Sequence, residues 1–294
     1  MTSTQVSRKR KWATVKIRKA KRSDKSPILE ISKKIWGGHD YLPGVWDDWV
    51  ADKNARFIVA TVDGRTVGCA HASLQANYVA WLDGVRVHEE YRGLGIAGKL
   101  NQALVQWAKR KGARVARLST GSSNRASRQH LSKIGFPVMG TFQRLDTTKG
   151  LRVKPAGITV PRRSAKNLWN WLRTRPNLRE NHATYSDGWT WHPITYHVLK
   201  SLIAKGRVLV TSRDGEPSAC CIFLDEEKIL TGGFVAGDHG EAVKLIRMLR
   251  FLKFQRKREK LRVLLPSRSP FLQRLESSGF KKGAKILVYE KFLG

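Results

Sequence analysis

Apolar and polar positions along the chain change from a strand-like to a helical pattern around a short glycine-rich stretch. Residues 78–87, Tyr-Val-Ala-Trp-Leu-Asp-Gly-Val-Arg-Val, alternate well enough to predict a buried strand. Residues 98–111 carry apolar side chains at helical spacing, namely Leu100, Ala103, Leu104, Trp107 and Ala108. Arg-Gly-Leu-Gly-Ile-Ala stands between them at 92–97. The pattern therefore predicts a strand, a tight turn and a helix in succession.

Similar patterns predict further elements in the first half of the chain. They are, in order, a strand at 15–20, a helix from Ser23 to about Trp36, strands at 56–62 and 66–72, a strand at 115–120, a helix capped by Asn124 and a last strand at 137–145. Asp63-Gly64 joins the second and third strands, and Asp-Gly is a strong signal for the tight turn of a β-hairpin.

The order of elements repeats in the second half. A Pro- and Lys-rich stretch at 151–165 marks the boundary, and strand-like stretches follow at 207–213, 218–224, 228–235 and 286–291. The chain has 294 residues, which suits two domains. We predict an α/β fold with a mixed α+β sheet. Its parts are a basic disordered tail at 1–13, one domain at 14–150 and a second at 151–294.

The glycine-rich turn has the chemistry of an anion site. The first N–H groups of a helix have no partner within the helix, and the helix dipole favours negative charge there. Gly93 and Gly95 let the backbone approach a phosphate where a Cβ would collide. The alternative is a strand-to-helix turn that glycine makes flexible and that binds nothing.

Two motifs give the chain a resemblance to the GNAT superfamily (Gcn5-related N-acetyltransferases). Arg92, Gly95 and Ala97 match the family's Gln/Arg-x-x-Gly-x-Gly/Ala loop, which binds the acyl-CoA pyrophosphate. About 30 residues later, 124–136 resembles the family's Asn-x-Ala, helix, Lys-x-Gly-Phe signature. The glycine spacing is wrong for a dinucleotide-binding fingerprint. The resemblance implies acetyl-CoA as cofactor, held by Val85, Arg86, Val87, Arg92, Gly93, Leu94, Gly95, Ile96, Ala97, Asn124 and Ser127.

A further segment narrows the resemblance. Residues 37–43, Gly-Gly-His-Asp-Tyr-Leu-Pro, with Trp46 and Trp49 after them, are similar to a segment of the tandem GNAT group that includes vertebrate histidine N-acetyltransferase. That group has a second, divergent GNAT-like half. The resemblance implies that the substrate side is built from Trp36, His39, Asp40 and Tyr41.

The second half lacks the loop chemistry of the first. Residues 236–241, Ala-Gly-Asp-His-Gly-Glu, stand where the loop would be, without the Arg or the Gly-x-Ala spacing. They put Asp238 and Glu241 where phosphates would bind. We expect 14–150 to be the catalytic GNAT domain and 151–294 to be a degenerate one.

Acetyl transfer to an amine needs a base for the amine, donors for the developing oxyanion and a proton for the departing thiolate. The resemblance implies that a backbone amide of the central strand, at Val85 or Val87, serves the oxyanion. Asp83 is the candidate base, and its side chain is expected on the same face of the strand as those of Val85 and Val87. The alternative is that Asp83 is a turn or salt-bridge residue.

The source of the thiolate's proton is open in this sequence. The family's usual Tyr falls at Leu131. His130 is adjacent but turned about 100° away on a helix. Tyr78 and Tyr41 are further candidates, and the thiolate could also leave unaided or take a proton from water.

The net charge of +33 is concentrated at 8–25, with ten Lys or Arg against one Asp, and at 244–262, with nine against Glu259. This charge has several open explanations. They are association with nucleic acid or the ribosome, attraction of the anionic cofactor, a generally basic proteome, and basic faces that are simply solvated.

The eight histidines show no metal-ligand spacing, so we expect no metal. Three cysteines, no secretory signal and no membrane-length apolar run predict a cytoplasmic protein.

These observations predict an N-acetyltransferase that uses acetyl-CoA and a primary amine, such as a small molecule or free amino acid. One alternative is a protein or peptide acetyltransferase, acting on an N-terminus or lysine and docked by its basic surface. Another is a non-catalytic module that binds CoA or nucleic acid. The sequence leaves the oligomeric state open.

Overall fold

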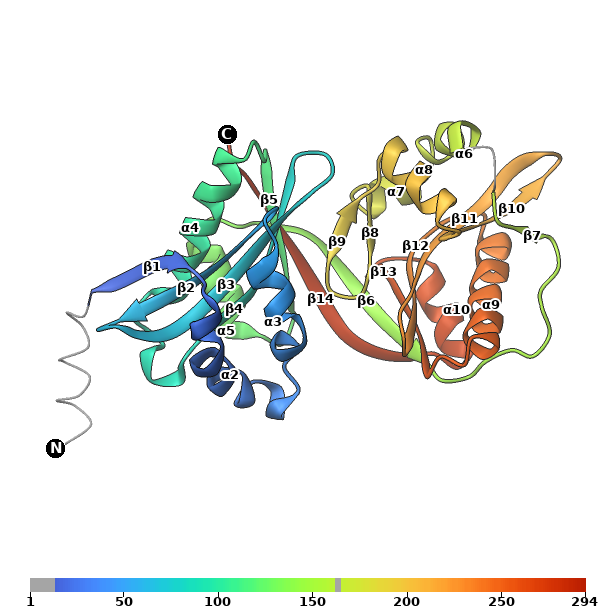
Figure 1. Ribbon diagram of the computed structural model, residues 1–294. Coiled ribbons are helices and arrows are strands. Elements are labelled where there is room, and N and C mark those ends of the chain that lie inside the picture. Colours follow the sequence, from blue (N-terminus) through green and yellow to red (C-terminus); the bar gives the residue numbers. More distant parts are fainter. Residues whose placement is uncertain (1–13, 162–164) are drawn as a thin grey trace. The chain divides into compact units, whose positions relative to one another are not determined.

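The computed structural model describes residues 14–161 and 165–294, so the predicted tail at 1–13 lies outside the described residues (Figure 1). The chain forms two compact units. The first contains the chain up to Leu118 together with Lys133–Gly135 and Lys291–Gly294, and the second contains Ser119–Ser132 and Phe136–Glu290. Each unit has its own strands and helices, as the α/β prediction requires.

The sheet of the first unit follows the order of the chain. Its strands are β1 (Val15–Lys19), β2 (Ala55–Val62), β3 (Arg65–Gln75), β4 (Val79–Val87) and the start of β5 (Val115–Gly121). The first three pairings are antiparallel and that of β4 with β5 is parallel. The predicted hairpin at 56–72 is confirmed as β2 and β3, with Asp63 and Gly64 at positive φ in its turn.

The helices of the first unit depart from the predictions in two places, since the helix predicted to reach about Trp36 ends at Lys33 and one further helix was not predicted. They are η1 (Arg22–Asp24), α2 (Lys25–Lys33), η2 (Trp36–Gly38), α3 (Leu42–Ala51), η3 (Glu89–Tyr91) and α4 (Ile96–Arg110). The predicted succession of strand, glycine turn and helix is confirmed in β4, residues 92–95 and α4. The sequence prediction missed α3, which has a proline in its first turn.

The two faces of this sheet are covered by different helices. Trp46 of α3 and Ile28 of α2 pack with Phe57 and Cys69 in one cluster. On the other face, Gly68 lies close to Ile96, the first residue of α4. Successive residues of a strand point to opposite faces, so the sheet separates α2 and α3 from α4.

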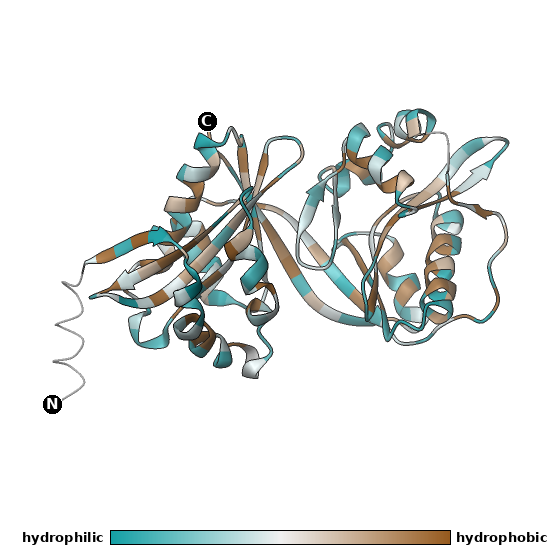
Figure 2. Ribbon diagram, viewed as in Figure 1, coloured by the Kyte–Doolittle hydropathy of each residue, from teal (hydrophilic) through white to brown (hydrophobic). Residues whose placement is uncertain are grey.

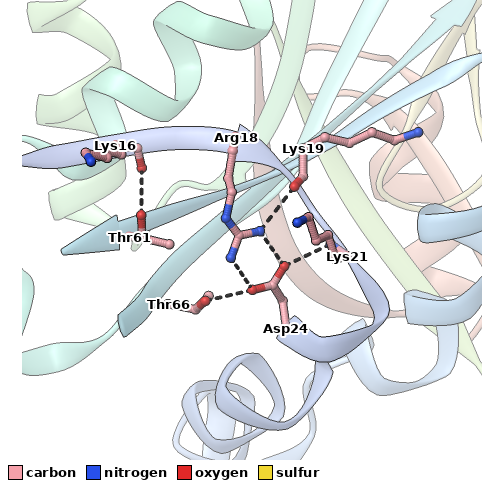
Figure 3. A network of polar contacts seen from close by, with 7 residues as sticks. All are labelled: Lys16, Arg18, Lys19, Lys21, Asp24, Thr61 and Thr66. Carbon is pink, nitrogen blue, oxygen red and sulfur yellow. Dashed lines mark hydrogen bonds and ion pairs between the residues drawn. The ribbon is translucent and has the colours of Figure 1, made fainter. Parts of the chain in front are cut away.

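Asp24 anchors the start of α2 to the sheet (Figure 3). Its carboxylate accepts two hydrogen bonds from Arg18 of β1, both 2.7 Å, and one from Thr66 of β3, also 2.7 Å. The backbone N–H of Lys21 donates a fourth at 2.8 Å. Burial alone would raise the pKa of Asp24, but the bonds from Arg18, Lys21 and Thr66 lower it overall.

A β-bulge in β4 changes which side chains share a face. Cys69 pairs with Arg86 and His71 pairs with Asp83, so two residues of β4, Gly84 and Val85, stand opposite one residue of β3. Asp83 therefore shares a face with Arg86.

The bulge changes the prediction that the side chains of Asp83 and Val87 lie on the same face of the sheet. Val87 pairs with Gly68, and Arg86 pairs with the next residue, Cys69. Neighbouring residues of a strand face opposite sides of the sheet, so Val87 faces away from the side of Arg86 and Asp83. Asp83 and Val87 consequently point to opposite faces, and the expected common parity is wrong for this pair. The alternation rule fails because the bulge inserts one residue between them.

The second unit repeats this plan with a longer sheet. Its strands lie in the order β14 (Lys281–Phe292), β6 (Val138–Thr147), β13 (Lys260–Pro266), β12 (Ile229–Gly237), β11 (Glu216–Asp225), β10 (Val208–Arg213) and β7 (Ile158–Thr159). A separate hairpin pairs β8 (Thr184–Ser186) with β9 (Trp191–Pro193). The helices are α5 (Arg125–Lys133), α6 (Ala165–Leu172), α7 (Pro176–Glu180), α8 (Tyr196–Ala204), α9 (His239–Gln255) and α10 (Phe271–Ser277).

The compact units do not divide where the sequence suggested. β6, expected to close the first domain, pairs antiparallel with both β13 and β14 of the second unit. The division at 150/151 remains a prediction about the repeat. α9 carries its apolar side chains on the sheet side and its basic ones outward, which gives the banded colouring in Figure 2.

Candidate functional site

The glycine loop follows β4 directly and leads into α4. Arg92 is extended, Gly93 has φ +80° and Gly95, the N-cap of α4, has φ +73°. These left-handed conformations strain any residue with a Cβ. Nothing lies within 4 Å of the place where a Cβ would stand on either glycine, so the loop borders open space. No side chain caps α4 at Gly95, which leaves its first N–H groups for an anion.

The central strand offers backbone donors beside this loop. β4 and β5 pair over three residues and the pairing ends at Trp81 and Arg117, well before β4 itself ends. The N–H of His88 donates to Val67 O of β3 at 2.8 Å. Successive N–H groups of a strand point to opposite sides, so the N–H of Val87 points away from β3, towards the β5 side of β4. On that side β4 no longer pairs with β5 at the level of Val87. An extended ligand can therefore hydrogen-bond to β4 there.

Arg86 and Asp40, predicted to bind cofactor and substrate, bind each other. Arg86 donates to Asp40 from Nε at 2.9 Å and from Nη2 at 2.6 Å. Ser32 Oγ donates to the same carboxylate at 2.5 Å. The two side chains are only 8% and 1% exposed. The pair joins β4 to the segment between α2 and α3, so these two side chains hold the segment against the strand.

The electrostatics of this pair follow from its burial. Burial alone would raise the pKa of Asp40, but the hydrogen bonds from Arg86 and Ser32 lower it overall. Burial alone would lower the pKa of Arg86, but the bonds to Asp40 and the nearby Tyr41 raise it overall. Both groups are therefore charged at neutral pH.

Asp83 is paired with a residue that the sequence did not single out. His71 Nδ1 lies 2.8 Å from Asp83 Oδ1. The histidine is 4% exposed, whereas the aspartate side chain is 29% exposed. Trp49 stacks on the His71 ring, with centroids 4.0 Å apart and an interplanar angle of 5°. The bulge prevented this pairing from being read from the hairpin pattern.

Tyr41 completes this group of side chains. Its ring lies edge-on to Trp49, with centroids 6.0 Å apart, and the Arg86 guanidinium lies 5.2 Å from its centroid. The residue is 43% exposed, so part of it faces solvent. Burial of the phenol and the nearby Asp83 carboxylate raise the pKa of Tyr41 above its usual range. The predicted residues Asp83 and Tyr41 are thus brought together.

The remaining predicted substrate residues lie on the same connection. Trp36 belongs to η2, and its side chain lies outside the described part of the structure. His39 is exposed just after η2. Lys34, at the end of α2, forms an ion pair with Glu89 of η3, which joins this connection to the segment before the glycine loop.

Tyr78 lies away from these residues. It precedes β4 in a turn with φ +58°, is 61% exposed and has Arg114 stacked 4.8 Å from its ring centroid. Asp83 lies five residues further along the strand, about 16 Å away at the usual rise. The structure therefore does not bring Tyr78 together with Asp83 and Tyr41.

Asn124, Ser127 and His130 belong to the second unit. Asn124 Oδ1 accepts the backbone N–H of Ser127 at 3.1 Å, which confirms Asn124 as the cap of α5. Its side-chain oxygen therefore serves the helix. Leu131, at the family's Tyr position, is buried and has no proton to give. His130 is partly buried.

In the second unit, other parts of the chain fill the space beside two glycines of β12, Gly233 and Gly237. A Cβ on Gly237 would lie 2.3 Å from Ser218 O, and the N–H of Gly237 donates to Asn177 Oδ1 at 3.1 Å. A Cβ on Gly233 would lie 1.9 Å from Ser186 O of β8. β8 thus packs against β12, whereas Gly93 and Gly95 of the first unit border open space.

Charge adds to this difference between the loops. Glu241, in the first turn of α9, accepts from Lys244 at 2.6 Å and lies 4.0 Å from Arg213. Asp238 lies 3.9 Å from the same arginine. The N-terminus of α9 is therefore already supplied with negative charge.

Comparison with known proteins assigns the chain to a family. Residues 25–136 match the family model described as acetyltransferase (GNAT) family. An aminoglycoside N(6')-acetyltransferase type 1 from Salmonella typhimurium is 31% identical over 117 residues, which cover 36% of this chain and 80% of that protein. The chain belongs to the GNAT family.

Other members of the GNAT family extend the comparison. A histidine N-acetyltransferase from Xenopus tropicalis is 30% identical over 107 residues, which cover 36% of this chain and 33% of that protein's length. A GCN5-related N-acetyltransferase from Sphaerobacter thermophilus has a TM-score of 0.67 at 14% identity, covering 95% of this chain and 96% of that one. A tandem GNAT protein from the clavulanic acid biosynthesis pathway has a TM-score of 0.59 at 12% identity, covering 96% and 99%. The predicted tandem GNAT fold is confirmed.

The described residues contain neither a metal-binding cluster of side chains nor a membrane-spanning helix. Within 14–161 and 165–294, no three His, Cys, Asp or Glu side chains gather as a metal-binding group. No helix in those ranges is both long and apolar enough to cross a membrane.

Proposed function

We propose that this GNAT protein is an N-acetyltransferase that moves the acetyl group of acetyl-CoA to a primary amine, and that the first unit carries the reaction. The observation that supports this most is the loop at Gly93 and Gly95, whose open, left-handed glycines lead into an uncapped helix. An acyl-CoA pyrophosphate suits this loop because no side chain occupies it. Acetyl-CoA supplies the thioester.

The residues of β4 have separate tasks in this proposal. The backbone N–H groups of Val85 and Val87 hold the carbonyl oxygen and stabilise the negative charge that develops on it. Asp83 takes a proton from the acceptor ammonium, which frees the nitrogen lone pair. Tyr41 and Trp49 form an aromatic wall next to that carboxylate.

We propose a small, positively charged amine as the acceptor. Residues 35–52, which include α3, contain Asp40, Asp47, Asp48 and Asp52 and no Lys or Arg, in a chain with a net charge of +33. Arg86 neutralises Asp40, and Lys25 pairs with Asp47 at 2.6 Å, so the exposed Asp48 and Asp52 are the carboxylates of this segment that favour a cation. The two relatives named for histidine and aminoglycoside acetylation support an amine of this class, a free amino acid included.

An acceptor screen tests this proposal. The protein is incubated with acetyl-CoA and a panel of amino acids, polyamines, aminoglycosides and peptides, and both free thiol and product mass are measured. We expect thiol release matched by acetylation of a small amine. Acetylation of peptide N-termini or lysines alone would instead support the protein acetyltransferase alternative. Binding of CoA without transfer to any amine would support a non-catalytic module.

We propose a second role for the outer face of α9, which is association with a polyanion such as nucleic acid. Arg247 is exposed and has no ion-pair partner among the described residues. Arg250 donates to the carbonyls of Lys149 and Ser278 rather than to an acid. Burial and the like charge of Arg247 lower the pKa of Arg250. Phosphates would relieve that repulsion.

The state of the cysteines supports a cytoplasmic location. Cys69, Cys220 and Cys221 are all free and buried. Burial raises the pKa of Cys69 and of Cys220 to about 12, which keeps these thiols protonated and unreactive. Free thiols of this kind suit a reducing compartment.

A further inference from the structure

His71 is an unusual residue for the interior of this unit. The residue is 4% exposed, and its Nε2 atom is buried without a hydrogen-bond partner among the described residues. Buried polar atoms normally have a partner, since leaving one unpaired costs free energy. A buried histidine with one unpaired nitrogen therefore calls for a functional explanation.

The ring is held in a fixed plane. Trp49 of α3 stacks on one face at 4.0 Å, and Phe57 of β2 lies edge-on with centroids 6.1 Å apart. His71 stands directly opposite Asp83 in the register of β3 and β4, immediately before the bulge. The contact between Nδ1 and Oδ1 at 2.8 Å is therefore fixed by both strands and by the aromatic packing.

This geometry favours one tautomer. A proton on Nε2 would be a buried donor without an acceptor among the described residues. A proton on Nδ1 instead donates to the Asp83 carboxylate. The ring proton then lies on the nitrogen that contacts the candidate base.

We propose that His71 is the positioning residue for Asp83, which orients its carboxylate and holds it in the charged form for proton abstraction from the acceptor amine. This inference rests on the proposed N-acetyltransferase function. The ammonium N–H bond breaks and an O–H bond forms on Asp83. The freed nitrogen lone pair then forms the C–N bond to the acetyl group while the C–S bond breaks and its electrons leave with sulfur. The nitrogen loses a second proton, which passes to the sulfur directly or through water, so that CoA leaves as the thiol and Asp83 returns its own proton to solvent.

Several other charged or titratable groups lie around Asp83. Tyr41 faces it from the segment before α3, and Arg86 shares its face of β4. Asp40 neutralises Arg86 from the connection between α2 and α3, and Cys69 is protonated beside Arg86 on β3. His71 is hydrogen-bonded to Asp83 through a proton that a point substitution can remove, and a planar ring at this position keeps the stack on Trp49.

Two substitutions separate positioning from packing. His71→Phe keeps a flat ring to stack on Trp49 but removes the donor to Asp83. His71→Asn loses the ring but can place an amide N–H near the position of Nδ1. We expect the acid limb of the pH profile of kcat/KM to move up by about one unit in His71→Phe and kcat to fall roughly tenfold. In His71→Asn the limb should stay within a few tenths of wild type.

Melting temperature and acetyl-CoA binding show whether each variant is folded. If His71 serves packing alone, His71→Phe should match wild type in its pH profile, and that result would overturn the proposal. A shifted limb in both variants would also contradict it, because the amide donor should preserve Asp83.

A spectroscopic test does not depend on turnover. The imidazole ¹⁵N shifts of the wild-type protein report the tautomer, and the His71 signal is assigned by its loss in His71→Phe. We expect the proton on Nδ1 near neutral pH. A proton on Nε2 alone overturns the proposal even if acetyl transfer is observed. The correct tautomer in a protein that acetylates no amine would refute the proposed function and leave the His71–Asp83 pairing as a structural fact.

Discussion

Trp49 lies over Gly84 so closely that a Cβ on Gly84 would stand 2.6 Å from its Cζ3 atom. The same indole ring stacks on His71, and Gly84 has φ +65° within the bulge of β4. The bulge, the indole and the His71–Asp83 pair therefore depend on the missing side chain at this one position.

We expect Gly84→Ala to displace Trp49 and to disturb Asp83. The left-handed backbone and the clash together should lower the free energy of unfolding by on the order of 1–3 kcal/mol. The value of kcat/KM for the amine should fall at least tenfold, because small displacements of catalytic groups are costly. Chemical denaturation and steady-state kinetics measure the two effects.

Gly64→Ala is the matched control for this change. Gly64 has φ +79° in the turn between β2 and β3, but nothing lies within 4 Å of its would-be Cβ. It therefore adds similar backbone strain without the clash. Equal losses of activity in the two variants would contradict the role given to Trp49.

Asp40→Asn should destabilise the first unit strongly. The substitution leaves the guanidinium of Arg86 buried without its counter-charge, which typically costs about 3–5 kcal/mol. Asp48→Asn, at an exposed position of α3, should change stability by less than about 0.5 kcal/mol. Denaturation curves of both variants make the comparison, and equal midpoints would contradict the structural role of the pair.

The same pair gives a pH dependence of defined sign. The folded-state pKa of Asp40 lies below its ordinary value of 3.8, so its contribution to stability is present above about pH 4. That contribution is lost as pH falls through the folded-state pKa. Asp24 behaves likewise. Stability of the wild type should therefore fall more steeply below pH 4 than that of Asp40→Asn.

Gly95→Glu should abolish binding of acetyl-CoA. It places a side chain and a negative charge beside the expected pyrophosphate, on a residue at φ +73°. Gly112→Glu is the matched control, because Gly112 has φ +82°, open space around it and a place just after the other end of α4. Calorimetry should find wild-type affinity in that control.

Gly240→Glu tests the second unit in the same experiment. Gly240 lies in the first turn of α9, beside the acidic groups that already occupy that helix end. We expect unchanged affinity and one acetyl-CoA per chain. Two sites per chain in the wild type would overturn the degenerate-half prediction.

The sequence was sufficient to predict most of the first unit and the location of its loop. The Asp63-Gly64 turn and the spacing of Gly93 and Gly95 are local signals, and local signals predict local structure. It did not predict α3, because Gly44 and the tryptophans of 42–51 give a weak helical signal that packing overrides.

The contacts inside the site were beyond sequence reasoning for a different reason. A bulge changes the face of every residue after it, so the pairing of Asp83 with His71 and of Arg86 with Asp40 depends on one inserted residue. The place of β6 depends likewise on strands that follow it by more than a hundred residues. Periodicity carries no information about such partners.

The basic surface has a prediction of its own. If α9 binds a polyanion, affinity for a single-stranded RNA oligonucleotide should fall steeply with salt, and Arg247→Glu should flatten that dependence. Arg110→Glu, an equal change of charge at an exposed position of α4 in the first unit, should have a smaller effect. Equal effects of the two charge reversals would show that the overall charge of +33, rather than α9, attracts the oligonucleotide.

Deleting residues 1–13 should leave turnover of a small amine almost unchanged.

The central claim is that Asp83 deprotonates an amine next to an acetyl-CoA loop in the first unit. The most direct test is the rate of product formation from acetyl-CoA and the best amine of the screen, in wild type and Asp83→Asn, followed by mass spectrometry across the pH range. We predict an acetylated amine in wild type and a kcat at least about 10²-fold lower in Asp83→Asn, with little change in KM for acetyl-CoA. A wild-type rate in Asp83→Asn at every pH would contradict the account.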